Sequence, residues 1–218
     1  MKKVKIAPSI LGVPCLETPN VIKNLLSSGA DIIHYDVMDG EFVSNTSFPI
    51  EEYEYHKAHI DSSVVFDVHL MTYDLVNTIK KFAPGASYIT FHYEAIEDNK
   101  IEDLISLIKS FNVKAGISIC PSTDVRVLNP YLKDLDLVLV MSVVPGKGGQ
   151  SFMVVSLDKI SYLDNYRKEY NLSYEIEVDG GINEETSKLV KERNVDILVA
   201  GSFIIKSNDY KAQIAKLK

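Results

Sequence analysis

The chain has 218 residues, of which 46% are hydrophobic and 24% are charged. This composition is ordinary for a soluble globular protein, and the length suits one large domain or two small ones. The formal net charge of −7 argues against a nucleic-acid partner, whose phosphates need a basic face, and against an anionic membrane surface. It permits a small anionic substrate, which backbone N–H groups or a bound cation can hold locally.

Cysteine content and hydropathy favour a cytoplasmic protein. Two cysteines, Cys15 and Cys120, are too few for a disulfide framework. No stretch of 18 uninterrupted apolar residues occurs, so we expect no membrane-spanning helix. The first residues include lysines but no long apolar run, and we therefore expect no secretory signal.

Short apolar runs rich in β-branched residues recur along the chain, bounded by turn residues. Such runs are typical of strands that are buried on both faces. In chain order, they predict strands at Val4–Ile10, Ile32–Val37, Val64–Leu70, Tyr88–His92, Lys114–Ile119, Leu137–Ser142, Tyr174–Val178 and Ile197–Ala200.

Helical patterns separate these strands. The first helix is expected to begin at Thr18, with Pro19 as its first helical residue, and to end near Gly29. The apolar residues of Lys100–Phe111 recur at helical spacing. Further helices are predicted at Asp74–Phe82, Leu157–Tyr170, Glu184–Arg193 and Asp209–Leu217, with a short helix at Asp124–Leu132 and the least regular pattern at Phe48–Asp61.

Alternating strands and helices imply parallel pairing through crossover connections. Two topologies fit this order: a closed eight-stranded barrel and an open doubly wound sheet. The count of eight strands favours a single (β/α)8 TIM barrel. Because no linker or low-complexity tract divides the chain, we expect one domain over residues 1–218.

Polar side chains gather where the predicted strands end, which is the functional end of such a barrel. His34 and Asp36 are two residues apart, as are Asp67 and His69. Alternate residues of a strand face the same side, so each pair points into the barrel mouth. These groups could simply be hydrogen-bonded interior residues. Burying two imidazoles and several carboxylates together is costly without a partner, however, and a divalent cation is a natural partner.

Histidines combined with carboxylates suit zinc, iron(II), cobalt or manganese better than magnesium or calcium. We therefore expect one divalent metal ion, with zinc or iron(II) as the first candidates and manganese or cobalt as alternatives. The ligands would come from separate strands, so no short sequence motif identifies the metal.

Glycine-bearing loops follow the last three strands: PGKGGQSF at Pro145–Phe152, then DGGI and AGS. Glycine lets the backbone approach a ligand closely and turn its N–H groups toward it. Loops after strands seven and eight are the usual phosphate site of this fold. Ordinary tight turns are the alternative, but three such loops together favour phosphate binding.

Other residues favour ordinary interpretations. His56 and His59 lie in a polar segment and are expected to be solvated. Lys147 either covers the phosphate or faces solvent, and both cysteines are expected to be inert.

A metal, two carboxylates and a phosphate site together suit a keto-sugar phosphate. One carboxylate would remove the proton next to the carbonyl, and a second would return one to the opposite face, inverting one carbon. Asp36 and Asp179 lie on strands that are not neighbours in the predicted order, so they could flank the substrate.

The strings APSIL, IIHYDVMDGEFVSN, DVHLM, ITFHYE, PGKGGQSF, VDGGI and VAGS run from Pro8 to Ser202. In order and spacing they resemble the ribulose-phosphate 3-epimerase family. The resemblance implies interconversion of D-ribulose 5-phosphate and D-xylulose 5-phosphate, by inversion at carbon 3 through an enediolate, in the pentose phosphate pathway. It also implies a small phosphorylated ketose as substrate and a homo-oligomer.

The resemblance further implies residue roles. A zinc-type metal would be held by His34, Asp36, His69 and Asp179, with Asp36 and Asp179 as the acid/base pair. The positions that match the substrate pocket, including its phosphate-binding backbone, are Ser9, His69, Met38, Met71, Met141, Gly148, Gly149, Gly180, Gly181, Gly201 and Ser202.

Three departures from the family pattern lie at the expected pocket rim. Ser44 stands in FVSN, Lys147 replaces an aromatic residue, and Glu41 follows MDG where a histidine is common. They bear on substrate identity more than on reaction type, so a hexulose-phosphate epimerase resembling allulose-6-phosphate 3-epimerase is an alternative. A phosphate-binding-barrel lyase is more distant, because it would need a lysine at a strand end within these motifs. A non-catalytic binder would not need to keep all the proposed ligands.

Overall fold

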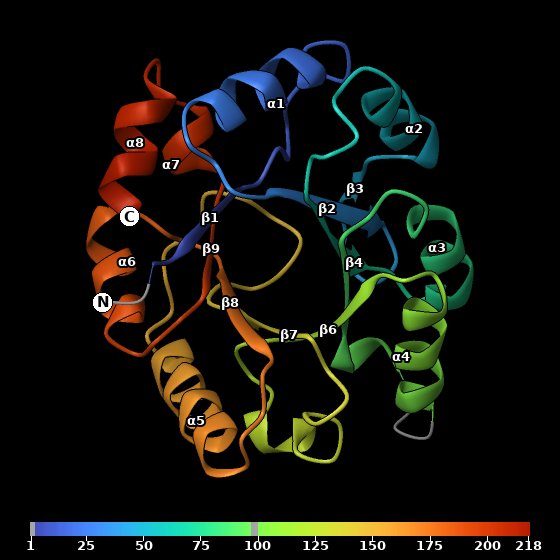
Figure 1. The fold of residues 1–218 in the computed structure, drawn as a ribbon, viewed down its shortest axis with the longest axis vertical. Helices are drawn as coiled ribbons and strands as arrows, with labels where there is room; N and C mark the ends of the chain where they lie inside the picture. Colours follow the sequence, from blue (N-terminus) through green and yellow to red (C-terminus); the bar gives the residue numbers. More distant parts are fainter. Residues whose placement is uncertain (1–2, 97–99) are drawn as a thin grey trace.

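The structure is a computed structural model and describes residues 3–96 and 100–218. Parallel strands form its centre, and helices surround them (Figure 1). The parallel strands are β1 (Lys5–Pro8), β2 (Ile33–Asp39), β4 (Phe66–Met71), β5 (Tyr88–His92), β6 (Lys114–Ile119), β7 (Leu137–Met141), β8 (Glu175–Asp179) and β9 (Ile197–Ala200).

The sheet closes on itself. Its strand order runs β1-β9-β8-β7-β6-β5-β4-β2, followed by β3 (Thr46–Ser47). An isolated parallel bridge joins Ser9 to His34, just beyond the end of β1, and the Ile10 N–H donates to the His34 carbonyl at 3.3 Å. The first and last parallel strands of the order therefore meet, which confirms the closed (β/α)8 barrel over the open doubly wound sheet.

The helices lie outside the strands with their apolar faces inward. In α4, the residues Ile101, Leu104, Ile105 and Ile108 are all buried, as their spacing predicted. The helices are α1 (Thr18–Ser27), α2 (Ile50–Ala58), α3 (Leu75–Phe82), α4 (Ile101–Ser110), α5 (Val155–Glu169), α6 (Glu184–Lys191), α7 (Ser202–Ile205) and α8 (Tyr210–Leu217), with 3-10 turns η1 (Tyr93–Ala95) and η3 (Val125–Leu128).

The short elements differ most from the prediction. The helix expected at Asp124–Leu132 is only the 3-10 turn η3. The Asp124 carboxylate caps it by accepting from the Arg126 N–H at 3.0 Å. Strand β3, helix α7 and turn η1 were not predicted. Strand β3 pairs antiparallel with the end of β2. Each is two to four residues long, too short for a periodic pattern.

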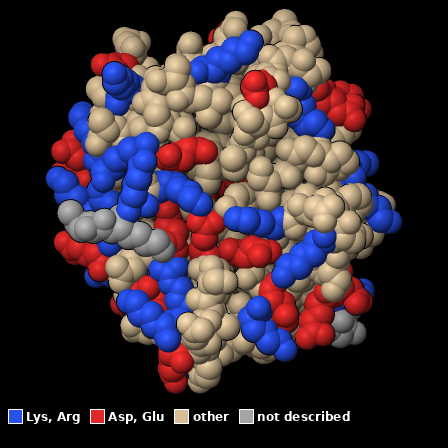
Figure 2. Space-filling view, viewed as in Figure 1, with Lys and Arg blue, Asp and Glu red and all other residues tan. Residues whose placement is uncertain are grey.

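Charged side chains of both signs are interspersed on the face drawn in Figure 2. At the amino-terminal end of the barrel, Lys5 Nζ lies 2.6 Å from Glu175 Oε1, and the Tyr88 hydroxyl donates to Glu175 Oε2 at 2.7 Å. These contacts join the first residues of three strands and leave the opposite end for the site. None of the helices in the described part of the chain has the length and apolar content that crossing a membrane requires.

Candidate active site at the carboxyl end of the barrel

Four side chains from three strands converge at the carboxyl end of the barrel. His34 and Asp36 come from β2, His69 from β4 and Asp179 from the last residue of β8. Each offers a ligand atom, and these atoms all lie within 4.8 Å of one another. Asp36 Oδ1 lies 3.2 Å from His34 Nε2 and 3.1 Å from His69 Nδ1. Because these atoms are close enough to hold a metal ion together, we call the four residues the metal-binding group.

The local backbone explains this convergence. Residues 34 and 36 both face inward because side chains alternate along a strand. The parallel register of β2 and β4 places His69 beside Asp36, so the two side chains leave the sheet at the same level. Asp179 reaches this level from across the barrel because β8 ends there.

Electrostatics hold the two carboxylates in different states. Burial alone would raise the pKa of Asp36, but the neighbouring His34 and His69 imidazoles outweigh burial and hold it well below its usual range. Burial, followed by the nearby Asp36 carboxylate, raises the pKa of Asp179 to about 7. Burial lowers the pKa of His34, yet Asp36 and Asp67 outweigh it and raise that pKa overall. The group therefore favours a positive charge at its centre.

Two imidazole nitrogens and two carboxylates form a donor set that suits zinc or iron(II). His34 and His69 are completely buried, and Asp36 is 4% exposed. A divalent cation among these groups would relieve the repulsion between Asp36 and Asp179 that raises the Asp179 pKa. The residues present thus fit such an ion.

A further pair of carboxyl groups lies beneath His34. Asp67 Oδ2 is 2.6 Å from His34 Nδ1, and Glu177 Oε1 is 3.9 Å from the same nitrogen. Burial, reinforced by Asp67, raises the pKa of Glu177 well above its ordinary value. Glu177 was missed in the sequence. Its position two residues before Asp179, repeating the spacing of His34 and Asp36, is the signal that could have identified it.

The main cavity, of about 1000 Å³, opens above the metal-binding group. Asp36 and Asp179 line it, whereas His34 and His69 lie behind it. The Ser9 hydroxyl donates to Asp36 Oδ2 at 2.7 Å. The other lining residues include the remaining predicted pocket residues, namely Met38, Met71, Met141, Gly148, Gly149, Gly180, Gly181, Gly201 and Ser202.

The backbone conformation after β8 requires glycine at two successive positions. Gly180 has φ +119° and Gly181 has φ +63°, a region that side-chain-bearing residues rarely adopt. A Cβ at Gly181 would lie 2.5 Å from the Phe152 nitrogen. Glycine therefore lets the loop after β8 pack directly on the loop after β7. Beyond it, the Asn183 side chain caps α6 by accepting from the Thr186 N–H at 3.0 Å.

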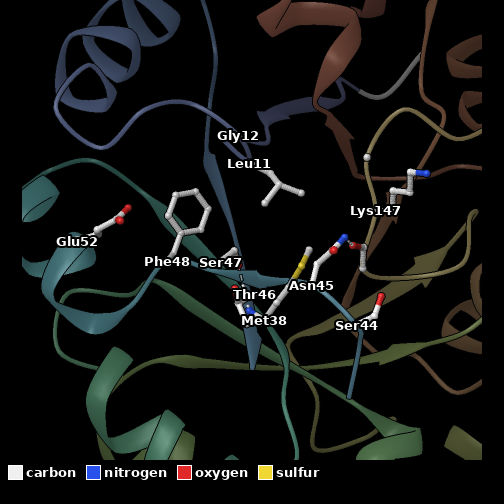
Figure 3. Close-up of a pocket in the computed structure, with 12 residues that line it drawn as sticks. Leu11, Gly12, Met38, Ser44, Asn45, Thr46, Ser47, Phe48, Glu52 and Lys147 are labelled. Atoms are coloured by element: carbon white, nitrogen blue, oxygen red, sulfur yellow. Dashed lines mark hydrogen bonds between the residues drawn. The ribbon is translucent and has the colours of Figure 1, made fainter. Parts of the chain in front are cut away.

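A smaller cavity of about 510 Å³ adjoins the main one and shares Leu11, Met38 and part of the loop after β7 with it. Figure 3 shows Phe48 on one side of this cavity and Asn45 and Lys147 on the other. Asn45 Nδ2 donates to the Gly146 carbonyl at 2.7 Å, which ties the segment after β2 to that loop. Lys147 is exposed at the shared rim.

His56 corrects the sequence interpretation. We expected it to be solvated, but it is fully buried. Its Nε2 lies 3.0 Å from the Cys15 carbonyl, which can only accept, so its Nδ1 accepts from the Tyr35 hydroxyl at 2.8 Å. Helix α2 turns this residue toward the outer face of β2. His59, one turn later, is exposed as expected.

Comparison with known proteins identifies relatives of this chain. The model of the Ribulose-phosphate 3 epimerase family matches residues 5–205. Ribulose-phosphate 3-epimerase of Bacillus subtilis (strain 168) is 40% identical over 217 residues, covering 99% of this chain and 98% of its own. The enzyme of that name from Escherichia coli (strain K12) is 36% identical over 220 residues, covering 100% of this chain and 96% of its own.

Solved structures share the fold at low identity. A 3-hexulose-6-phosphate synthase has a TM-score of 0.71 at 15% identity and covers 98% of each chain. A 3-keto-L-gulonate-6-phosphate decarboxylase from Vibrio cholerae has a TM-score of 0.75 at 14% identity and covers 99% of this chain and 96% of its own. The family model and the sequence relatives extend over nearly the whole chain. This chain belongs to the ribulose-phosphate 3-epimerase family.

Proposed function

We propose that this protein interconverts D-ribulose 5-phosphate and D-xylulose 5-phosphate by inversion at carbon 3. The observation that carries the proposal is the placement of Asp36 and Asp179 at one cavity floor. In the barrel, β1 and β9 separate the strands that bear them, so the two carboxyl groups reach the cavity from different directions. Inversion needs this arrangement, with one acid/base group on each face of a planar enediolate.

The proposed proton transfers use these two residues. In one direction, the ionised carboxylate accepts the proton from carbon 3 while the other carboxyl group, carrying a proton, donates from the opposite face. The roles exchange in the reverse direction. Ser9 donates to Asp36 Oδ2 and thereby orients this carboxylate. Met38, Met71 and Met141 would exclude water from the enediolate.

We further propose that His34, Asp36, His69 and Asp179 hold one divalent cation. Zinc or iron(II) suits this donor set best, and manganese or cobalt are alternatives. When bound, such a cation stabilises negative charge that develops on the substrate oxygens. The substrate phosphate would lie on the backbone of the loops that contain Gly148, Gly149, Gly180, Gly181, Gly201 and Ser202.

The lyase alternative finds little support at this cavity. Among the described residues, the lysines that line it are Lys147 and Lys206. Neither belongs to a barrel strand, and both are exposed at the rim, where neither is placed to protonate a carbanion at the floor.

Substrate preference and reaction route are tested together. The purified protein is incubated with D-ribulose 5-phosphate and, separately, with D-allulose 6-phosphate, and kcat/KM is compared. We expect preference for the pentulose phosphate, and deuterium from heavy water at carbon 3 of recovered substrate. A higher value for the hexulose phosphate would reassign the substrate, and turnover without solvent exchange would contradict the two-carboxylate route.

We also propose that the protein self-associates and acts in the cytoplasm. Leu16, outside the main cavity, is 77% exposed, and contact with a second subunit would bury it. Both cysteines are free, as in a reducing compartment. Light scattering coupled to size exclusion tests the first point, and a single-subunit mass at micromolar concentration would contradict it.

A further inference from the structure

A row of polar groups leads away from the metal-binding group behind His69. His69 Nε2 lies 2.9 Å from His92 Nε2, and His92 Nδ1 lies 3.1 Å from Glu94 Oε2. Both imidazoles are fully buried. His92 ends β5, and Glu94 lies in the turn η1 that follows it. We call His69, His92 and Glu94 the imidazole row.

The donors and acceptors of this row permit one consistent assignment for a metal ligand. A carboxylate accepts only, so the His92 Nδ1–H donates to Glu94. A neutral imidazole carries a proton on only one ring nitrogen, so the Nε2 of His92 is then an acceptor. His69 Nε2–H must then donate to His92, and the lone pair of neutral His69 lies on Nδ1. That nitrogen faces Asp36 at 3.1 Å.

The opposite assignment would disable the site. If His92 donated from Nε2, His69 would carry its proton on Nδ1 and could not ligate a cation from that atom. The acceptor oxygen of Glu94 therefore decides, through His92, which nitrogen of His69 is available. His34 is held in a similar way, but by a carboxylate without an intervening histidine. Asp67 Oδ2 lies 2.6 Å from His34 Nδ1, and His34 Nε2 faces Asp36.

Hydrogen bonds fix Glu94, at the end of the imidazole row that is most distant from the metal-binding group. Glu94 Oε1 accepts from the Cys120 N–H at 2.8 Å and from the Thr123 hydroxyl. The ammonium of Lys159, from α5, donates to the carbonyls of Cys120 and Thr123 at 2.7 and 2.6 Å, and to that of Pro121. Lys159 is 7% exposed. These contacts fix the loop after β6 that positions Glu94.

A second metal site at His92, Glu94 and Cys120 is the competing explanation, since their ligand atoms lie within 4.8 Å of one another. A thiolate would be needed there. Burial, followed by Glu94, raises the pKa of the Cys120 thiol to about 12, and both Glu94 oxygens already accept hydrogen bonds. We therefore assign His92 and Glu94 to the imidazole row rather than to a second metal site.

We propose that His92 and Glu94 are positioning residues, which hold His69 in the orientation and tautomer that place its Nδ1 lone pair in the metal-binding group. The proposal rests on the metal-binding role proposed above for His69. It assigns a function to two residues that touch neither the cavity nor the proposed ion. Removing such a partner from a ligating histidine typically weakens metal affinity 10–100-fold.

The test measures zinc affinity of the full chain by competition with a chromophoric chelator. His92→Leu removes the acceptor for His69, and we expect a dissociation constant about 10–100-fold weaker. His92→Gln retains a carbonyl acceptor and should recover most of the loss. His56→Gln is the matched control, because His56 is equally buried and doubly hydrogen-bonded but lies outside the barrel. Wild-type affinity in His92→Leu, or equal losses in His56→Gln, would overturn the proposal.

A second readout reports the tautomers directly. In the wild-type protein, long-range ¹H–¹⁵N spectra should show His92 protonated at Nδ1 and His69 at Nε2. The reverse assignment would also refute the proposal. If His92→Leu does not fold, as judged by circular dichroism, Glu94→Leu gives the same affinity test, because it removes the acceptor for His92 Nδ1–H. Because no substrate is used, unchanged metal affinity counts against the row, whereas metal binding without epimerisation counts against the proposed function.

Discussion

At the scale of single residues, the site depends on one shared atom. Asp36 Oδ1 lies within 3.2 Å of one nitrogen from each of His34 and His69. Asp36 Oδ2 accepts from Ser9, so both oxygens of this carboxylate have partners. At Asp179, burial and the nearby Asp36 carboxylate outweigh the effect of His34, and its pKa is raised rather than lowered. The two carboxyl groups are thus chemically distinct although both line the cavity floor.

The clearest single-residue prediction concerns Asp179. Asp179→Asn removes a proposed acid/base group while keeping its size, so kcat should fall by about 10²–10⁴-fold, measured by a coupled epimerase assay. Glu175→Gln, on the same strand at the opposite end of the barrel, should retain activity. Near-wild-type turnover by folded Asp179→Asn would remove Asp179 from this role.

At the scale of elements, polar anchors join helices to loops that the apolar core does not reach. Lys159 of α5 donates to three carbonyls of the loop after β6, and His56 of α2 bridges Tyr35 of β2 and the Cys15 carbonyl. Each anchor satisfies backbone or side-chain groups that would otherwise be buried without partners. These anchors set the position of loops at the barrel mouth.

Loss of the Lys159 hydrogen bonds should destabilise the folded protein. Lys159→Met keeps the length of the side chain but leaves three carbonyls without their charged donor. We expect the free energy of unfolding in urea to fall by about 2–4 kcal/mol. Lys188→Met replaces a side chain that is 64% exposed beside Glu184, and it should change this free energy by less than about 0.5 kcal/mol. Equal effects of the two substitutions would contradict the anchoring role.

The anchor at His56 predicts a pH dependence. Burial lowers the pKa of His56 below its ordinary 6.5, so the folded protein binds fewer protons there than the unfolded chain. Its stabilising effect is full above pH 6.5 and is lost as pH falls below this value. The stability difference between wild type and His56→Gln should therefore shrink between pH 7.5 and 5.5 in urea titrations. A constant difference would show that His56 does not titrate in this way.

At the scale of the whole molecule, the barrel brings distant parts of the sequence to one point. The strands that carry Asp36 and Asp179 meet at the same end because the sheet closes between Ser9 and His34. The opposite end is occupied by Lys5, Glu175 and Tyr88. In the proposed function, the chemistry takes place at the carboxyl end, whereas the contacts at the opposite end join strands of the barrel.

Metal binding should stabilise the entire fold, because its ligands come from strands on different sides of the barrel. An ion present at 100 times its dissociation constant adds about 2.7 kcal/mol, which corresponds to a rise in Tm of roughly 5–10 °C for a chain of this size. Zinc added after chelator treatment should produce this shift in a thermal melt and restore activity. Asp179→Asn should show a smaller shift. Full activity in a rigorously metal-stripped sample would contradict the metal proposal.

Much of the barrel was readable from local patterns. The strand runs and the apolar spacing of α4 depend only on neighbouring residues. The pairs His34 and Asp36, and Asp67 and His69, were placed on inward faces because side-chain direction alternates along any strand. The elements that were missed, β3, α7 and η1, are held by contacts with other parts of the chain and leave no periodic signal.

What the sequence by itself determined is therefore the set of strands and the side chains that face inward at their carboxyl ends. Only the tertiary structure decided which of these meet. It buried His56 against Tyr35, placed Glu177 beneath His34, and aligned His92 and Glu94 behind His69. The reason is physical: periodicity depends on the nearest residues along the chain, whereas hydrogen bonds across a closed sheet depend on register and closure, which join residues far apart in sequence.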